Sequence, residues 1–231
     1  RLWLNWVLLA LFMAVFIVSL NVPGSPFLPL RSLPTVGRMT QLFQPGEGSG
    51  RVRVLIWQGV LKLIAPHDPL GIPGDELAGP DPRNTFRPLI GYGPESMFNA
   101  FARVYPPELA HVEARGSSAD RSHNETFDSL ATMGILGFLA YYFLMFSLFY
   151  YLLKLVGWIP DEAARRRLLV LLGIGGVAGV VIPRLLTGDF VFSGVGSPAA
   201  MVFMILIYLT WQALVKTAES SLDDTGTEQP N

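Results

Sequence analysis

Four long apolar runs constrain the fold of this chain more than any other feature of its sequence. They cover residues 2–20, 129–153, 168–186 and 198–215. A helix needs about 20 apolar residues to cross the hydrocarbon core of a bilayer. We therefore expect an all-α polytopic membrane protein with about four transmembrane helices.

The composition agrees with a lipid bilayer as the main partner. The 231 residues are 51% hydrophobic and 15% charged, whereas soluble domains carry about 25% charged residues. The net charge of −1 lacks the basic surplus of nucleic-acid-binding proteins, so nucleic acid is not an expected partner. The absence of cysteine excludes disulfides, thiolate nucleophiles and Cys-based metal sites.

The start of the chain is unusual for a complete protein. It begins with Arg1 rather than Met, and the first apolar run follows at once. That run is longer than the apolar region of a signal peptide and is not followed by an A-x-A-like cleavage site. We expect residues 1–20 to form a membrane span and the chain to be the C-terminal portion of a longer protein.

Basic residues between the second and third runs predict the orientation. Lys154 and the triplet at 165–167 lie in the short connection 154–167, and Lys and Arg in short loops mark the cytoplasmic side. The loop 21–128 and the short loop 187–197 are then external. The polar, acidic tail 216–231 is expected to be cytoplasmic and disordered.

The long external loop is predicted to contain short helices. Residues 21–128 hold 14 of the 18 prolines and 12 of the 23 glycines, which favours turns over a regular domain. The stretch 52–64 predicts an amphipathic interfacial or re-entrant helix with Arg51, Gln58 and Lys62 on one face. The stretch 95–104, which follows Pro94, predicts a second helix.

Small residues in the third apolar run predict close packing between helices. Gly173, Gly175, Gly176 and Gly179 lie within this run, and small residues allow neighbouring membrane helices to approach. The GIGG segment is surrounded by apolar residues, so we interpret it as a packing feature and not as a phosphate-binding loop.

The loop prefers arginine to lysine. Residues 21–125 contain nine Arg and one Lys against ten acids. The planar guanidinium binds phosphate oxygens through two parallel hydrogen bonds and stays charged. An external arginine cluster therefore suggests a lipid-linked phosphate or an anionic headgroup, while pairing of these arginines with the ten acids is the alternative.

Histidine is scarce, and one histidine is well placed for chemistry. The three are His67, His111 and His123, none at the spacing of a helical metal site, so we expect no metal and no cofactor. His123 lies in DRSHNETF directly before the second apolar run, where a neutral imidazole can act as a general base. The alternative is a capping box from Ser122 to Glu125 that leaves His123 without a role.

Four segments, in order, resemble the C-terminal half of the O-antigen ligase and polymerase superfamily. They are SGRVRVLIW (49–57), RPLIGYGPESMF (87–98), DRSHN (120–124) and LATMGILGFLAYYFLMF (130–146). The similarity covers about residues 49–150. The order of the segments and their position before a span carry the resemblance.

The resemblance implies a metal-independent glycosyltransferase of the bacterial cytoplasmic (inner) membrane, acting on its outer face in lipopolysaccharide or other polysaccharide biosynthesis. Such enzymes move a glycan from a polyprenyl-diphosphate carrier to a hydroxyl of a glycan or lipid acceptor. The family arginine that holds the diphosphate matches Arg51, and the histidine that assists the acceptor matches His123. Arg87 and Arg121 are weaker diphosphate candidates, and Tyr92 and Glu95 are candidates for the acceptor side.

Two departures from the family pattern leave other functions open. The family's second diphosphate-binding arginine belongs to an upstream Ser-Arg motif, which here would precede Arg1. The insertion-like stretch 67–86 also leaves the alignment of Arg83 and Arg87 open. A polymerase of the same superfamily and a non-catalytic membrane subunit are the alternatives to a ligase.

Overall fold

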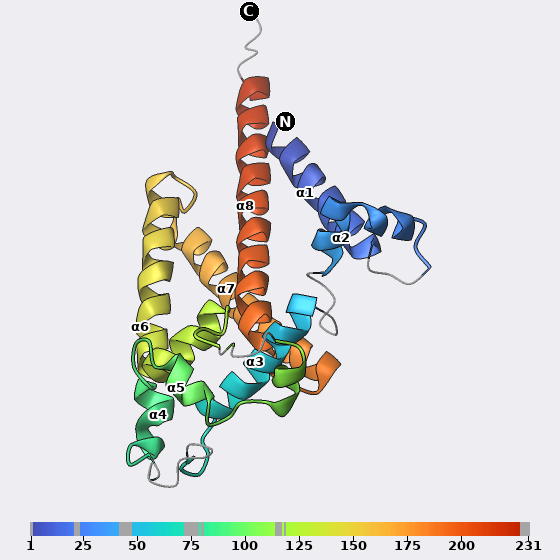
Figure 1. Cartoon of the computed structure of the whole chain (residues 1–231). Coiled ribbons are helices and arrows are strands. Elements are labelled where there is room, and N and C mark those ends of the chain that lie inside the picture. The colour runs from blue at the N-terminus through green and yellow to red at the C-terminus, as the bar shows by residue number, and fades with distance from the viewer. Residues whose placement is uncertain are drawn as a thin grey trace, which may run out of the picture.

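A computed structural model of the chain describes residues 2–20, 24–41, 48–71, 79, 81–113, 117 and 119–226. Every regular element within these residues is helical (Figure 1). Four long helices follow the apolar runs: α1 (Leu2–Ser19), α6 (Glu125–Leu155), α7 (Glu162–Thr187) and α8 (Ser193–Gly226). The predicted all-α class is confirmed.

Short helices fill the described parts of the long loop between α1 and α6. They are η1 (Leu28–Ser32), α2 (Pro34–Gln41), α3 (Gly48–Ile64), η2 (Asn84–Phe86), α4 (Arg87–Ile90), α5 (Met97–Phe101) and η3 (Pro107–His111). The predicted helix at 52–64 is present as most of α3. Figure 1 shows α3, α4 and α5 gathered near the start of α6.

Three of the four predicted spans are long and apolar enough to cross a membrane. They are Glu125–Leu155, Glu162–Thr187 and Ser193–Ala218. In α1 the apolar stretch found among the described residues is Asn5–Ile17, which is shorter than these three. The protein is therefore an all-helical membrane protein with three candidate spans in the described part of the chain.

Helices α7 and α8 pack directly on each other because glycine removes the side chains between them. A Cβ at Gly175 would meet the Ala200 carbonyl oxygen at 2.9 Å, and a Cβ at Gly179 would overlap the backbone of Gly196. Nothing lies within 4 Å of a Cβ built at Gly173. The predicted close packing thus holds for Gly175 and Gly179, while Gly173 faces open space.

The ends of the last two helices differ from the prediction. Helix α7 begins at Glu162, because the Asp161 side chain accepts a hydrogen bond from the Ala164 N–H at 2.6 Å and caps it. The arginine triplet 165–167 therefore lies in the first turns of a helix and not in a loop. Helix α8 starts at Ser193, before the predicted 198.

The tail predicted to be disordered is helical as far as Gly226. Its first residues, Lys216 to Leu222, contain Ala, Glu and Leu, which favour helix, and no proline. Extending an existing helix needs no new nucleus. Residues 227–231 lie outside the described residues.

The connection between α6 and α7 is fastened to α8. The Tyr208 hydroxyl donates to the Trp158 carbonyl oxygen at 2.7 Å, and Gln212 donates to the Tyr208 hydroxyl at 2.9 Å. Lys216 donates to the Gly157 carbonyl oxygen at 2.8 Å and lies over the Trp158 ring. These bonds fix the ends of all three candidate spans relative to one another.

Candidate functional site

The start of α6 is built by a polar cap that contains part of the DRSHN segment. The Asn124 side chain accepts hydrogen bonds from the N–H groups of Thr126 at 3.1 Å and Phe127 at 3.3 Å. Asn124 is thus the N-cap, and the predicted capping box led by Ser122 is wrong. Asn124 caps the helix in place of Ser122 because its side-chain carbonyl oxygen accepts hydrogen bonds from two N–H groups of the first turn.

Ser122 stabilises this cap from inside the protein. It is fully buried, its hydroxyl donates to the Asn124 carbonyl oxygen at 2.9 Å, and its N–H donates to Asp128 at 2.7 Å. The first turn of α8 closes the site, since a Cβ at Gly194 would meet the Asn124 amide nitrogen at 2.8 Å. The DRSHN segment is therefore rigidly held where α6 and α8 meet.

His123 is exposed between these two buried neighbours. Its φ is +54°, in the left-handed region that few residues other than glycine adopt, although His is enriched there relative to most. The conformation turns the imidazole outward while Ser122 and Asn124 stay buried. An exposed imidazole on a fixed backbone is able to receive a proton from a bound molecule.

Helix α3 is joined to the DRSHN segment by its tryptophan. The Trp57 Nε1–H donates to the Ser122 carbonyl oxygen at 2.8 Å, a buried bond between residues 65 positions apart. The Trp57 ring also meets the Phe127 ring edge to face, with centroids 6.1 Å apart. Two of the four segments noted in the sequence are thus in direct contact.

Arg51 lies on the exposed face of α3, together with Gln58 and Lys62, as predicted. Its side chain makes no ion pair with any residue that the structure describes. It precedes Trp57 by six residues, which corresponds to about 120° around the helix from the tryptophan. No described hydrogen bond or ion pair connects Arg51 to His123.

The turn Gly91-Tyr92-Gly93 after α4, the GYG turn, is hydrogen-bonded to α6 next to a break in that helix. Gly134 has φ +66° and ψ −174°, which interrupts the helix. Backbone carbonyls beside the break accept hydrogen bonds from the turn: Ala131 from the Tyr92 N–H and Thr132 from the Gly93 N–H, each at 2.8 Å. The second and fourth sequence segments are therefore linked through their backbones.

Tyr92 belongs to a polar network that holds Arg87. The Arg87 guanidinium lies 4.8 Å from the centre of the Tyr92 ring, and its Nε donates to Asp81 at 2.7 Å. His67 Nε2 is 3.2 Å from the Tyr92 hydroxyl. Arg87 is mostly buried, and the Asp81 carboxylate already compensates its positive charge.

The charges in this network shift two pKa values. The hydrogen bond from Arg87 holds the pKa of Asp81 below its ordinary value of 3.8. Burial raises the pKa of the Tyr92 phenol above 10.0. Near neutral pH, Asp81 is therefore ionised and Tyr92 keeps its proton.

Glu95 and Arg121 come together from different segments. The Glu95 carboxylate lies 3.7 Å from the Arg121 guanidinium, and both side chains are exposed. Glu95 itself has φ +55°, so it cannot begin the helix predicted at 95–104. Only α5 (Met97–Phe101) is helical there, because the chain turns at Glu95 and again ahead of Pro106 and Pro107.

A cavity of about 240 Å³ opens beside this ion pair. Its charged lining consists of Glu95, Asp120, Arg121, Glu125 and Asp128. Four carboxylates against one guanidinium favour hydroxyl donors, such as those of a sugar, over a phosphate group. Neither Arg51 nor His123 lines this cavity.

The sequence did not indicate the roles of His67 and Asp81. Both lie in the Pro-rich stretch 67–86, where no periodicity relates one residue to another. The signal that could have identified Asp81 is its position six residues before Arg87 in a turn-rich segment. Within the described part of the chain, no group of three or more His, Asp or Glu side chains is arranged to hold a metal ion.

The fold and these contacts define an all-helical membrane protein with a polar site at the start of its first long described span. Comparison of the chain with protein-family models, with curated proteins and with solved structures finds no match.

Proposed function

We propose that this protein is part of a membrane glycosyltransferase that moves a glycan from a polyprenyl-diphosphate carrier to an acceptor hydroxyl, as an O-antigen ligase does. One observation carries the proposal. The four segments that resemble that superfamily meet around the start of α6, although they span about 100 residues of sequence. Trp57 bonds Ser122, Arg121 pairs with Glu95, and Tyr92 bonds Ala131.

The proposed reaction assigns the proton to His123. The acceptor hydroxyl attacks the anomeric carbon of the donor glycan, and its proton passes to the His123 imidazole. A new glycosidic C–O bond forms as the bond from the anomeric carbon to the diphosphate oxygen breaks. The exposed ring and fixed backbone of His123 suit a general base that meets a substrate from outside the protein.

The departing polyprenyl diphosphate needs positive charge where its negative charge develops. Arg51 supports this role because it is exposed and has no acidic partner among the described residues. Arg121 is a weaker candidate: its pairing with Glu95 is long and solvent-exposed and therefore weak, but it lines a cavity that also holds four carboxylates. Arg87 is held by Asp81 and Tyr92, so we assign it to positioning the GYG turn.

The acidic cavity beside Glu95 is the proposed acceptor site. Its carboxylates can accept hydrogen bonds from sugar hydroxyls, and they repel a diphosphate group. This separates an acceptor side near Glu95 from a donor side that includes Arg51. Tyr92 shapes the acceptor side through the GYG turn.

The test is transfer of glycan from a polyprenyl-diphosphate donor by the full-length protein in membranes. His123→Ala is expected to lower the rate about 10²- to 10⁴-fold, as loss of a general base does, and Arg51→Ala about 10²- to 10³-fold. His111→Ala and Arg53→Ala are matched controls, because both residues are exposed and lie outside the proposed roles. Undiminished transfer by both His123→Ala and Arg51→Ala would overturn the proposal.

The same variants distinguish the alternatives. A non-catalytic subunit predicts that His123→Ala is silent while Arg51→Ala lowers the amount of assembled complex. A polymerase predicts the same losses as a ligase but with growing glycan as the acceptor, so supplying either glycan or lipid acceptor separates these two.

A further inference from the structure

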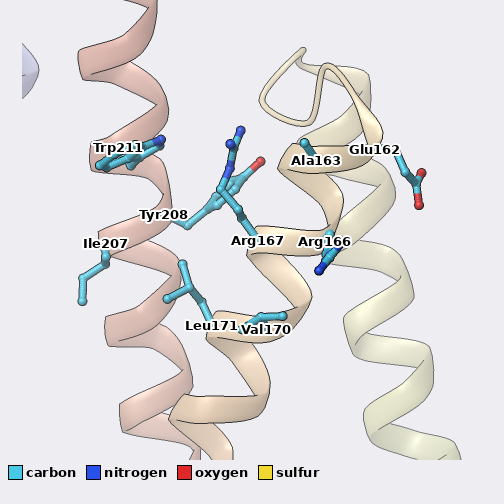
Figure 2. Close-up of a pocket in the computed structure, with 9 residues that line it drawn as sticks. All are labelled: Glu162, Ala163, Arg166, Arg167, Val170, Leu171, Ile207, Tyr208 and Trp211. Atoms are coloured by element: carbon cyan, nitrogen blue, oxygen red, sulfur yellow. The ribbon is translucent and has the colours of Figure 1, made fainter.

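A second cavity lies at the opposite end of the long helices from the DRSHN segment, between the start of α7 and the later part of α8 (Figure 2). Its volume is about 720 Å³. Its lining comes from the first three turns of α7, residues 162–171, and from residues 207–211 of α8. None of these residues has a role in the proposed glycosyl transfer.

The lining is divided between charge and hydrocarbon. Arg166 and Arg167 lie in the second turn of α7, and Val170 and Leu171 follow one turn further into the span. Ile207 lies on the α8 side of the cavity. Figure 2 shows Arg167 rising between the two helices beside Tyr208. A molecule that fits this lining has an anionic part next to the arginines and an apolar part that extends along α7 toward the membrane interior.

The two arginines have no acidic partner among the residues that the structure describes. The nearby Glu162 carboxylate is bound by Arg165 at 2.9 Å and points away from Arg167 (Figure 2). Asp161 is used as the N-cap of α7. Positive charge at a helix N-terminus is itself unfavourable, because the helix dipole is positive there. A bound anion relieves both effects.

The aromatic residues near the cavity are of the types that concentrate at the membrane surface. Trp158, Tyr208 and Trp211 lie at this end of the three spans, and Trp and Tyr concentrate at the level of lipid headgroups. Trp211 is 57% exposed, so its ring is open to neighbouring lipid. The cavity thus combines cations, interfacial aromatics and an apolar wall at headgroup depth.

From this charge complementarity we infer that the cavity binds an anionic phospholipid of the bilayer. The phosphate lies against Arg166 and Arg167, and one acyl chain follows Val170, Leu171 and Ile207 between α7 and α8. The leaflet is the one adjoining the arginine triplet, which the distribution of Lys and Arg makes cytoplasmic. Each arginine near an anionic lipid surface is expected to strengthen the preference for anionic lipid about fivefold.

The test measures quenching of Trp211 fluorescence by lipids brominated on their acyl chains. The protein is reconstituted in two sets of vesicles that contain the same proportions of phosphatidylglycerol and phosphatidylcholine. Phosphatidylglycerol is the brominated species in one set and phosphatidylcholine in the other. The Trp211 contribution is the part of the signal that Trp211→Phe removes, which separates it from the other four tryptophans.

Brominated phosphatidylglycerol is expected to quench Trp211 more strongly than brominated phosphatidylcholine. Arg167→Gln should reduce this preference about fivefold, and Arg167→Lys should retain part of it, which also shows that the site folds with an altered side chain. Lys154→Gln is the matched control, because it removes one positive charge from the same end of the spans, where Lys154 is exposed and does not line the cavity.

Three results would overturn the inference. Equal quenching by the two lipids would mean that the groove does not select anionic headgroups. An equal loss of preference in Lys154→Gln and Arg167→Gln would indicate only diffuse surface charge. Absence of Trp211 quenching by either lipid would mean that protein, and not lipid, covers the groove.

Discussion

At the scale of single residues, the Asp81–Arg87 pair links stability to pH. The pKa of Asp81 in the folded protein is below its ordinary value of 3.8, so the stabilisation it gives is fully present above about pH 4. It is lost as the pH falls through the lowered pKa. Asp81→Asn should lower the free energy of unfolding by about 1 to 3 kcal/mol at neutral pH, because it leaves a largely buried guanidinium without its partner.

The measurement is thermal unfolding in detergent at several pH values. The difference between wild type and Asp81→Asn should shrink below about pH 4 as wild-type Asp81 takes up its proton. Asp68→Asn is the matched control, since the Asp68 side chain is exposed and makes no ion pair among the described residues. A difference that is constant between pH 7 and pH 3 would contradict the assignment to the Asp81 carboxylate.

The residues proposed for the site were selected from the sequence by their type and position, which gave no information on their contacts. The position of His123 before an apolar run drew attention to it, and the structure adds that its side chain is exposed. Arg87 was a weaker diphosphate candidate, chosen for its type and its place in one of the four segments. The ion pair between Arg87 and Asp81 forms in a Pro-rich loop, whose sequence has no periodicity from which a contact can be derived.

At the scale of helices, the packing of α7 on α8 depends on the position of each glycine. Gly179→Ala should destabilise the protein by about 1 to 3 kcal/mol, because the new methyl group overlaps the Gly196 backbone and must push α8 away. Gly173→Ala is the control in the same helix, where nothing lies within 4 Å. It should be neutral or stabilising by up to about 1 kcal/mol, owing to the helix propensity of alanine.

Thermal unfolding midpoints of the two variants in the same detergent measure this difference. If both variants unfold at the same temperature, the glycines do not set the distance between α7 and α8.

The break in α6 at Gly134 provides a second prediction about helices. Gly134→Ala adds a side chain at φ +66° and places its Cβ against the Leu89 carbonyl. Gly188→Ala has the same backbone strain, at φ +73°, but nothing within 4 Å. We expect a loss of about 1 to 2 kcal/mol for Gly188→Ala from strain alone and a larger loss for Gly134→Ala.

The larger loss should be accompanied by release of the GYG turn, since the carbonyls of Ala131 and Thr132 hold that turn only while α6 is broken. Amide hydrogen exchange at Tyr92 and Gly93 measures it and should speed up in Gly134→Ala but not in Gly188→Ala. Equal exchange in both variants would show that the break does not hold the turn.

The helices were easier to predict than their ends and interruptions. Long apolar runs identify α6, α7 and α8 because only a helix satisfies its backbone within a membrane. The run around Gly134 has the same composition on both sides, so nothing in its hydropathy marks a break. The start of α7 depends on one side chain, Asp161, whose capping bond becomes evident only from the geometry.

At the scale of the whole molecule, the arrangement of the spans predicts which ends share a side of the membrane. Three candidate spans in succession place residues before α6 on one side and the connection between α6 and α7 on the other. The arginine triplet predicts that the second of these is cytoplasmic. The loop that contains Arg51 and His123 is then predicted to be external, which the proposed transfer from a lipid-linked donor on the outer face needs.

The lack of cysteine makes this orientation directly measurable. Single cysteines at Ser117, Ala163 and Ala218 occupy exposed positions before α6, at the start of α7 and late in α8. A membrane-impermeant maleimide should label Ser117→Cys in intact cells and the other two only after permeabilisation, because an odd number of spans separates 117 from 163 and from 218. The reverse pattern would place the DRSHN segment in the cytoplasm, where an external donor cannot reach it. Labelling of all three in intact cells would mean that α6 does not span the membrane, because α6 is the candidate span that the structure describes between 117 and 163.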